Sequence, residues 1–170
     1  MVGLLALAAA LLVYQLLAGK SQVNSRLLQT APTAAIDTAS GFVGVSAQGA
    51  VLSWQPPPKE SSLPLLPVKR PPASGRLSGT ALQQALVLGA APAALRPHLK
   101  SSSYGSTGVD VQLRTGVVLR FGDAGERARK WQAAAAVLAD PAVSALDYVN
   151  LSVPGRPGIG GSGHSLPPVP

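Results

Sequence analysis

The sequence predicts an α+β fold, a mixed or antiparallel sheet packed against helices and preceded by an N-terminal apolar helix. Several short segments alternate apolar and polar side chains, which is the pattern of a strand with one buried face. Two other segments carry apolar residues at helical spacing. The residues that follow Met1 are almost all apolar. A length of 170 residues accommodates one modest domain with appendages, which is the organisation we expect.

Residues 1–19 are the expected apolar helix and a candidate transmembrane span. Only Tyr14 and Gln15 interrupt the apolar run from Val2 to Ala18. A membrane span requires about 20 such residues, so this run is slightly short. A core helix, or the remnant of another module, is the alternative that the length leaves open. Residues 20–30 are expected to be a linker.

A strand, a hairpin and a proline-rich crossing are expected next. The segment TAPTAAID, residues 30–37, is the candidate entering strand, and Gln48-Gly49 marks the turn of a hairpin between two apolar runs. Seven of the 16 prolines lie within residues 55–78, so regular structure is not expected there. This stretch is either an extended segment whose leucines pack onto the core or a polyproline-II ligand for an SH3-type domain.

One helix and one loop are predicted before the central unit. The helix runs from Ala81 to about Ala90, with Thr80 as its cap and leucines at the packing positions. The serine-rich residues 101–108 are expected to form a loop.

Residues 109–157 hold the most consistent local signals. Apolar and polar side chains alternate over 109–114 and again over 117–121, with Thr115-Gly116 as a turn between the two strands. Alternation returns over 148–153 as a third strand. Beyond Pro157, the tail of residues 158–170 is rich in glycine, proline and serine, and we expect it to be disordered. We expect residues 161–170 to be dispensable for folding.

The predicted helix of this unit lies between its second and third strands. Asp123 and Glu126 stand at capping-box spacing, and Pro141 prevents the helix from continuing. Trp131 and Leu138 fall on the face that should cover the sheet, so we expect Trp131 to be buried. The unit therefore reads strand, turn, strand, helix, strand.

These residues resemble the C-terminal part of the FtsQ/DivIB family of bacterial cell-division proteins. The resemblance rests on LRTGVVLRFGDAGERARKWQAAAAVLAD (113–140) and LDYVNLSVPGRPGIGG (146–161), and earlier on GFVGVSAQGAVL (41–52) and SSLPLL (61–66). It implies an FtsQ/DivIB-like β domain over residues 31–157. The POTRA module that the family carries before this domain has no room here, so we expect it to be missing or truncated.

The resemblance implies a function in the divisome and in septum formation. The protein would be a non-enzymatic scaffold that binds FtsB- and FtsL-like division proteins. It would sit in the cytoplasmic membrane as a single-pass protein with its C-terminal domain outside the cytoplasm. Lys20 and Arg26 by themselves favour a cytoplasmic domain under the positive-inside rule, and we follow the resemblance.

Strand addition is the expected mechanism of partner binding. The last predicted strand, Tyr148 to Val153, is a candidate sheet edge whose unpaired backbone groups can template a partner strand. The basic residues of the preceding helix would complement an acidic partner. The predicted partner-binding residues are Arg127, Lys130, Tyr148, Asn150, Ser152, Val153, Pro154 and Arg156.

The residue chemistry offers no signal for catalysis, and we expect no enzyme activity, no metal and no cofactor. Gly158, Gly160 and Gly163 match a dinucleotide-binding pattern, but no helix is predicted after them to receive a pyrophosphate. His98 and His164 are far apart and lack ligand partners at metal spacing.

The net charge supports a second function. With 14 basic and 7 acidic residues the chain carries +7. Its basic residues are scattered and few aromatic residues accompany them, which disfavours a nucleic-acid surface. The alternative function is a small basic domain that binds lipid or another polyanion and has no role in division.

Overall fold

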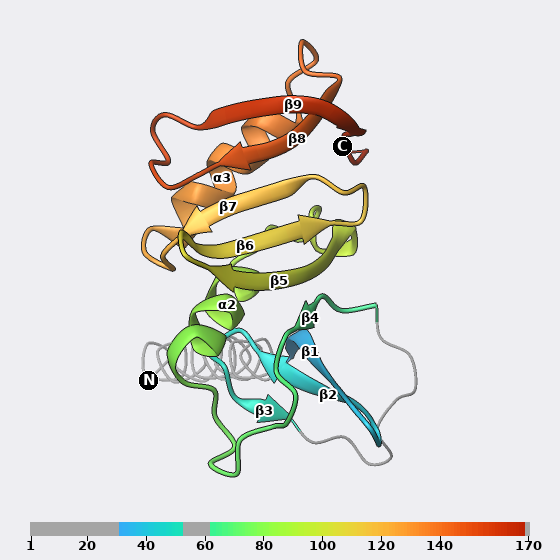
Figure 1. Ribbon diagram of the computed structural model, residues 1–170, viewed down its shortest axis with the longest axis vertical. Helices are drawn as coiled ribbons and strands as arrows, with labels where there is room; N and C mark the ends of the chain where they lie inside the picture. Colours follow the sequence, from blue (N-terminus) through green and yellow to red (C-terminus); the bar gives the residue numbers. More distant parts are fainter. Residues whose placement is uncertain (1–30, 53–61, 169–170) are drawn as a thin grey trace, which may run out of the picture. The chain divides into compact units, whose positions relative to one another are not determined.

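The structure, a computed structural model, describes residues 31–52 and 62–168, and from Pro32 onward these belong to one compact unit. They form one nine-stranded mixed sheet with two α-helices packed against it (Figure 1). The predicted α+β class, with a sheet packed against helices, is therefore confirmed. The expected apolar helix over 1–19 and the linker over 20–30 lie outside the described residues. Among the helices that are described, none is long and apolar enough to cross a membrane.

The sheet has the strand order β3-β2-β1-β4-β5-β6-β7-β8-β9. Its strands are β1 (Pro32–Thr38), β2 (Gly41–Ser46), β3 (Val51–Leu52), β4 (Leu65–Leu66), β5 (Leu99–Gly105), β6 (Gly108–Leu113), β7 (Val118–Gly122), β8 (Ala145–Asn150) and β9 (Gly158–Ser165). The pairs β1–β4, β4–β5 and β7–β8 are parallel, and the other neighbours are antiparallel.

Both helices lie on the same face of the sheet. Helix α2 (Gly79–Gly89) connects the parallel strands β4 and β5, and α3 (Arg127–Leu138) connects the parallel strands β7 and β8. The pairings make β4, β5, β7 and β8 run in one direction, and both crossovers step the same way along the sheet. Since such crossovers are right-handed, both helices fall on one side. A hydrogen bond joins them there, from Trp131 Nε1 to the Val87 carbonyl oxygen at 2.7 Å.

The alternating strands over 109–121 are confirmed. Val109, Val111, Leu113, Leu119 and Phe121 are all fully buried beneath the helices. Trp131 is also buried, as predicted, and its ring centroid lies 4.7 Å from that of Phe121. One apolar layer between the helices and this part of the sheet therefore forms the core.

The prediction of a loop over 101–108 is wrong, because residues 99–105 form β5. Its serines interrupt the apolar alternation from which a strand would be predicted. Ser102 points toward the helices and is buried, and its hydroxyl donates to Gln84 Oε1 of α2 at 2.8 Å. Because this hydrogen bond satisfies both side chains, a buried polar pair can occupy a position where an apolar residue would be expected.

Neither predicted helix cap forms. Helix α2 begins after Ser78, whose side chain makes no capping hydrogen bond. Glu126 precedes α3 in the left-handed region, at φ 46°, and makes no capping bond either. The carboxylate of Asp123 instead accepts from the Gly125 amide at 2.9 Å and from Lys130 Nζ at 2.8 Å.

The expected disorder of residues 158–170 is wrong over most of that range. Residues 158–165 form β9, which pairs antiparallel with β8. Leu166 packs against the core, and Pro167 is buried. Because β9 pairs with it, β8 has a neighbour on each side, β7 and β9. The predicted free edge over Tyr148–Val153 is therefore wrong as well.

Candidate partner-binding edge

Strand β9 is the terminal strand of the sheet (Figure 1, red). Its inner side pairs with β8, and no strand in the described part of the chain pairs with its outer side. It is eight residues long, whereas β3 at the opposite edge has two. A long edge strand presents a row of unpaired N–H and C=O groups, which is a template for another strand. We call the outer side of residues 158–165 the free edge.

The pairing register shows which backbone groups the free edge exposes. The Leu151 amide donates to the Arg120 carbonyl oxygen at 2.8 Å, so Leu151 faces β7. Since neighbouring residues of a strand face opposite sides, Asn150 and Tyr148 face β9. Their partners Gly158 and Gly160 therefore bond back to β8. Ile159 lies between them, and its N–H and C=O point outward.

The glycines of β9 accommodate side chains of β8. A Cβ atom at Gly160 would lie 2.7 Å from the ring tip and hydroxyl of Tyr148, so the ring lies across this residue. The carboxylate of Asp147 occupies the space beside Gly161, which has φ +77°, and accepts from the Gly163 amide at 2.8 Å. Glycine is thus required by close approach here and does not signal disorder.

The face of the sheet opposite the helices is polar next to β9. Asp110, Arg120 and Asn150 are cross-strand neighbours in one row, and Val118 and Tyr148 belong to the next. The Arg120 Cζ lies 4.0 Å from the centroid of the Tyr148 ring, which is the geometry of a cation–π contact. We call this surface, formed by Asp110, Arg120, Tyr148 and Asn150, the polar face.

Burial and charge act in opposite directions on Asp110. Desolvation raises the pKa of its carboxyl group, and the nearby Arg120 charge lowers it, with a net raised pKa. Its Oδ1 is buried and has no hydrogen-bond partner. The carboxylate therefore offsets part of the Arg120 charge without forming an ion pair with it.

Several predicted site residues lie beside the free edge but do not form it. Tyr148 and Asn150 belong to β8 and reach the surface only on the polar face. Ser152, Val153, Pro154 and Arg156 lie in the turn from β8 to β9. Asn150 Oδ1 organises this turn by accepting from the amide of Ser152 at 3.0 Å and from its hydroxyl at 2.8 Å. The exposed side chain of Val153 sits at its corner.

The two predicted residues of the helix have different environments. Arg127 is exposed at the start of α3, and its guanidinium donates to the Ala124 carbonyl oxygen at 3.4 Å. Lys130 is only 3% exposed. Its ammonium group donates to the carbonyl oxygens of Phe121 and Asp123 and to the Asp123 carboxylate, at 2.8–3.0 Å. The expectation that Lys130 offers its charge to a partner is therefore wrong.

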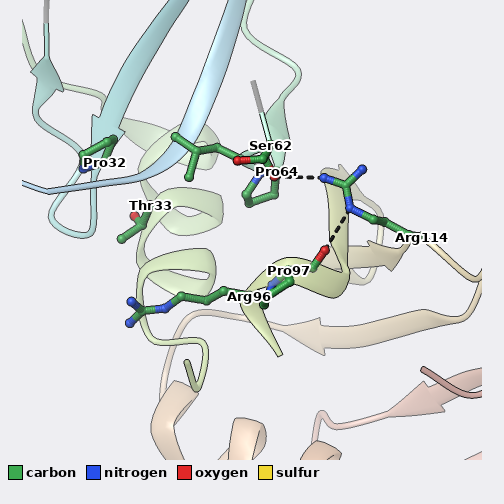
Figure 2. Close-up of a pocket in the computed structure, with 8 residues that line it drawn as sticks. Pro32, Thr33, Ser62, Pro64, Arg96, Pro97 and Arg114 are labelled. Carbon is green, nitrogen blue, oxygen red and sulfur yellow. Dashed lines mark hydrogen bonds between the residues drawn. The ribbon is translucent and has the colours of Figure 1, made fainter. Parts of the chain in front are cut away.

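A cavity of about 500 Å³ lies far along the sheet from β9, where β1 begins and β6 ends. It is lined by Pro32, Thr33, Ser62, Leu63, Pro64, Arg96, Pro97 and Arg114. In Figure 2 the Arg114 guanidinium donates to the carbonyl oxygens of Pro97 (2.9 Å) and Ser62 (2.8 Å), while that of Arg96 points away from it. The two cations do not converge on one ligand. Arg114 instead ties the proline-rich segment to the start of β5.

Sequence reasoning missed the residues that form the free edge, 158–165. Their glycine content resembles a disordered tail, and only Ile159 among them is a large apolar residue. No apolar alternation marks them as a strand, so the local sequence carries no clear signal for β9. Within the described residues, no group of three or more His, Cys, Asp or Glu side chains is placed to hold a metal ion.

Comparison with known proteins adds no relative at this point: no protein-family model matches the sequence, and no curated protein matches it.

Proposed function

We propose that this chain is a non-enzymatic interaction module of the bacterial divisome, of the FtsQ/DivIB type, that binds FtsB- or FtsL-like proteins by strand addition. The observation that carries the proposal is the free edge of β9, eight residues long and without a strand partner in the described part of the chain. The proposed binding edge is therefore Gly158–Ser165, in place of the Tyr148–Val153 edge expected from the sequence.

The succession of elements supports the family assignment. The strand, turn, strand, helix, strand unit over the residues that carry the resemblance corresponds to β6, β7, α3 and β8 in that order. With the family assignment comes the proposed location, a single-pass protein of the cytoplasmic membrane whose C-terminal domain lies outside the cytoplasm.

Strand addition explains binding without a pocket. The backbone of an incoming strand would hydrogen-bond to the outward N–H and C=O of Ile159 and extend the sheet by one strand. Main-chain bonds supply affinity with little sequence preference, and the side chains beside the edge select the partner. Ile159 is 49% exposed, and its side chain shares the helix-side face with Val149.

A proline at Ile159 tests the proposal. Ile159→Pro removes an N–H that faces outward, so the bonds between β8 and β9 are retained while the template is interrupted. We expect binding of FtsB- and FtsL-like segments from the same organism, measured by calorimetry on the full chain, to fall by at least tenfold. Ile159→Ala is the matched control for the side chain alone and should have a much smaller effect.

Thermal unfolding of each variant confirms that the fold is retained. Undiminished capture by a folded Ile159→Pro protein would contradict strand addition at β9. Failure of the unmodified chain to bind any such segment would contradict the divisome assignment. Salt-sensitive binding to anionic vesicles that Ile159→Pro leaves unchanged would favour the lipid- or polyanion-binding function.

A further inference from the structure

Tyr148 extends from the second strand of the sheet to its free edge. The ring lies across Gly160, since a Cβ atom there would be 2.7 Å from Cε1, Cζ and the hydroxyl oxygen. An added strand would lie about 4.8 Å beyond β9. The Tyr148 hydroxyl would therefore border the first side chain that such a strand places on the polar face.

The register defines where that side chain would stand. Gly160 bonds inward to Tyr148, so an antiparallel partner residue opposite Gly160 forms a non-hydrogen-bonded pair with it. In such pairs the Cα atoms are only about 4.5 Å apart and the side chains share one face. Because Gly160 has no side chain, the partner's side chain meets Tyr148 directly.

The charge at this position is positive. Arg120 is exposed on the polar face with its Cζ 4.0 Å from the Tyr148 ring centroid. In the described part of the chain its side chain has no ion pair within 4.0 Å and no hydrogen bond. Asp110 lies near enough to interact with this charge, but no ion pair within 4.0 Å joins it to Arg120 in the described residues.

We propose that Arg120 and Tyr148 recognise a carboxylate side chain of the partner strand, at the position opposite Gly160. The Tyr148 hydroxyl donates a hydrogen bond to the carboxylate, and Arg120 supplies the opposite charge. A glutamate suits the site best because it is long enough to reach both groups. This specificity rests on the proposed strand addition, and it predicts which partner strands the edge accepts.

Two glycines of β9 provide a matched test. Gly160→Ala forces the tip of the Tyr148 side chain away, since the new Cβ would come within 2.7 Å of it. Gly158→Ala lies on the same face two residues earlier, and its nearest neighbour would be the Asn150 Cβ at an ordinary 3.7 Å. Affinity for the FtsB-like segment should fall about tenfold in Gly160→Ala and less than twofold in Gly158→Ala.

Conservative variants separate the hydroxyl from the charge. Tyr148→Phe keeps the ring under Arg120 but removes the donor, and Arg120→Gln removes the charge; each should weaken binding about tenfold. The probe is the FtsB-like segment with each acidic residue replaced in turn by its amide. One replacement should reproduce the loss and show no further loss in Tyr148→Phe or Arg120→Gln, as expected for coupled residues.

Ile159→Pro separates the failure of this specificity from the failure of strand addition. If Ile159→Pro abolishes binding while Tyr148→Phe, Arg120→Gln and every amide replacement leave it unchanged, carboxylate recognition is wrong and strand addition stands. If a folded Ile159→Pro protein binds normally, or the unmodified chain binds no segment, both proposals fail. Equal effects of Gly160→Ala and Gly158→Ala would also overturn the role of Tyr148.

Discussion

At the scale of single residues, Lys130 shows how one buried charge organises a loop. Its ammonium group has three oxygen partners, the carboxylate and backbone carbonyl of Asp123 in the β7–α3 connection and the carbonyl of Phe121 in β7. The resulting contacts hold residues 121–126 in a turn whose last residue, Glu126, is left-handed. A side chain that the sequence suggested for binding is thus committed to the fold.

Replacing Lys130 with methionine should destabilise the protein by about 1–3 kcal/mol, because the buried hydrogen bond to the Phe121 carbonyl and the partly buried one to the Asp123 carbonyl would be lost. The apolar stem of the side chain is largely retained. Arg129→Met is the control, since it removes an exposed ion pair with Glu126 and should change stability by less than about 0.5 kcal/mol. Urea unfolding measures both. Equal effects would contradict the role assigned to Lys130.

The ion pair of Lys130 also has a pH signature. The hydrogen bond from Lys130, together with that from the Gly125 amide, holds the pKa of Asp123 below its usual 3.8. A lowered folded-state pKa contributes stability above pH 3.8, and this is lost as pH falls through the folded-state value. The Asp123→Asn variant should therefore differ from the unmodified protein at pH 7 and converge with it at low pH. A difference in stability that stays unchanged as the pH falls from 7 into the acid range would contradict the assignment.

Trp131 joins the two helices to the sheet. It is 1% exposed, packs on Phe121 and donates to Val87. Trp131→Ala should cost about 3–5 kcal/mol in the free energy of unfolding, from the cavity and the lost burial. Trp131→Phe should cost less, because most of the burial is kept and the Val87 carbonyl oxygen still accepts from the Ala90 amide at 3.2 Å. In a Trp54→Phe background the Trp131 fluorescence should be blue-shifted, and a solvent-like maximum would contradict its burial.

At the scale of secondary-structure elements, β9 is a strand stabilised by its neighbours and not by its own composition. Seven of its eight residues are exposed, so it buries little surface of its own. The Asp147–Gly163 hydrogen bond and the packing of Leu166 anchor its second half. The strand therefore depends on pairing with β8 and on glycine at the points of close approach.

Truncation after Gly160 tests this account. It removes residues 161–165 of β9 and the core contact of Leu166. A loss of about 1 kcal/mol would lower the melting temperature by roughly 2–4 °C in a chain of 170 residues. An unchanged melting temperature in the truncated chain would mean that β9 adds no stability and that β8 is effectively the edge.

At the scale of the whole described unit, the sheet has a weak joint at β4. This two-residue strand joins β1 through two residue pairs and β5 through one. Strands β5 to β8 share longer registers and lie beneath both helices. Pairing alone therefore connects β1–β3 to the remainder only loosely, and α2 supplies much of the link.

Hydrogen exchange of native protein should reveal this unevenness. We expect the slowest amides in β6 and β7, each paired on both sides, and faster exchange throughout β1–β3, because short connections allow local opening. Arg114→Ala should accelerate exchange in β4 and at the start of β5, since Arg114 ties Ser62 to Pro97. Exchange in β2 as slow as that in β7 would contradict a weak joint at β4.

The sequence by itself determined the elements that bury one apolar face. The alternation over 109–121, the helix that carries Trp131 and the α+β class all followed from residue spacing. Such periodicity is a local property, because a residue's position in a strand or helix decides which face it occupies. The same reasoning placed Tyr148 on the outward face of its strand.

Only the tertiary structure decided where the sheet ends and which charges are free. Ser102 of β5 is satisfied by Gln84, 18 residues earlier, and the glycines of β9 make room for Tyr148 and Asp147 of β8. Lys130 is bound by three oxygens of Phe121 and Asp123, outside its own helix. Each of these contacts joins different elements of the fold. A polar or glycine-rich segment carries no local record of the neighbour that satisfies its backbone, so its pairing, and with it the free edge, emerges only once the sheet is assembled.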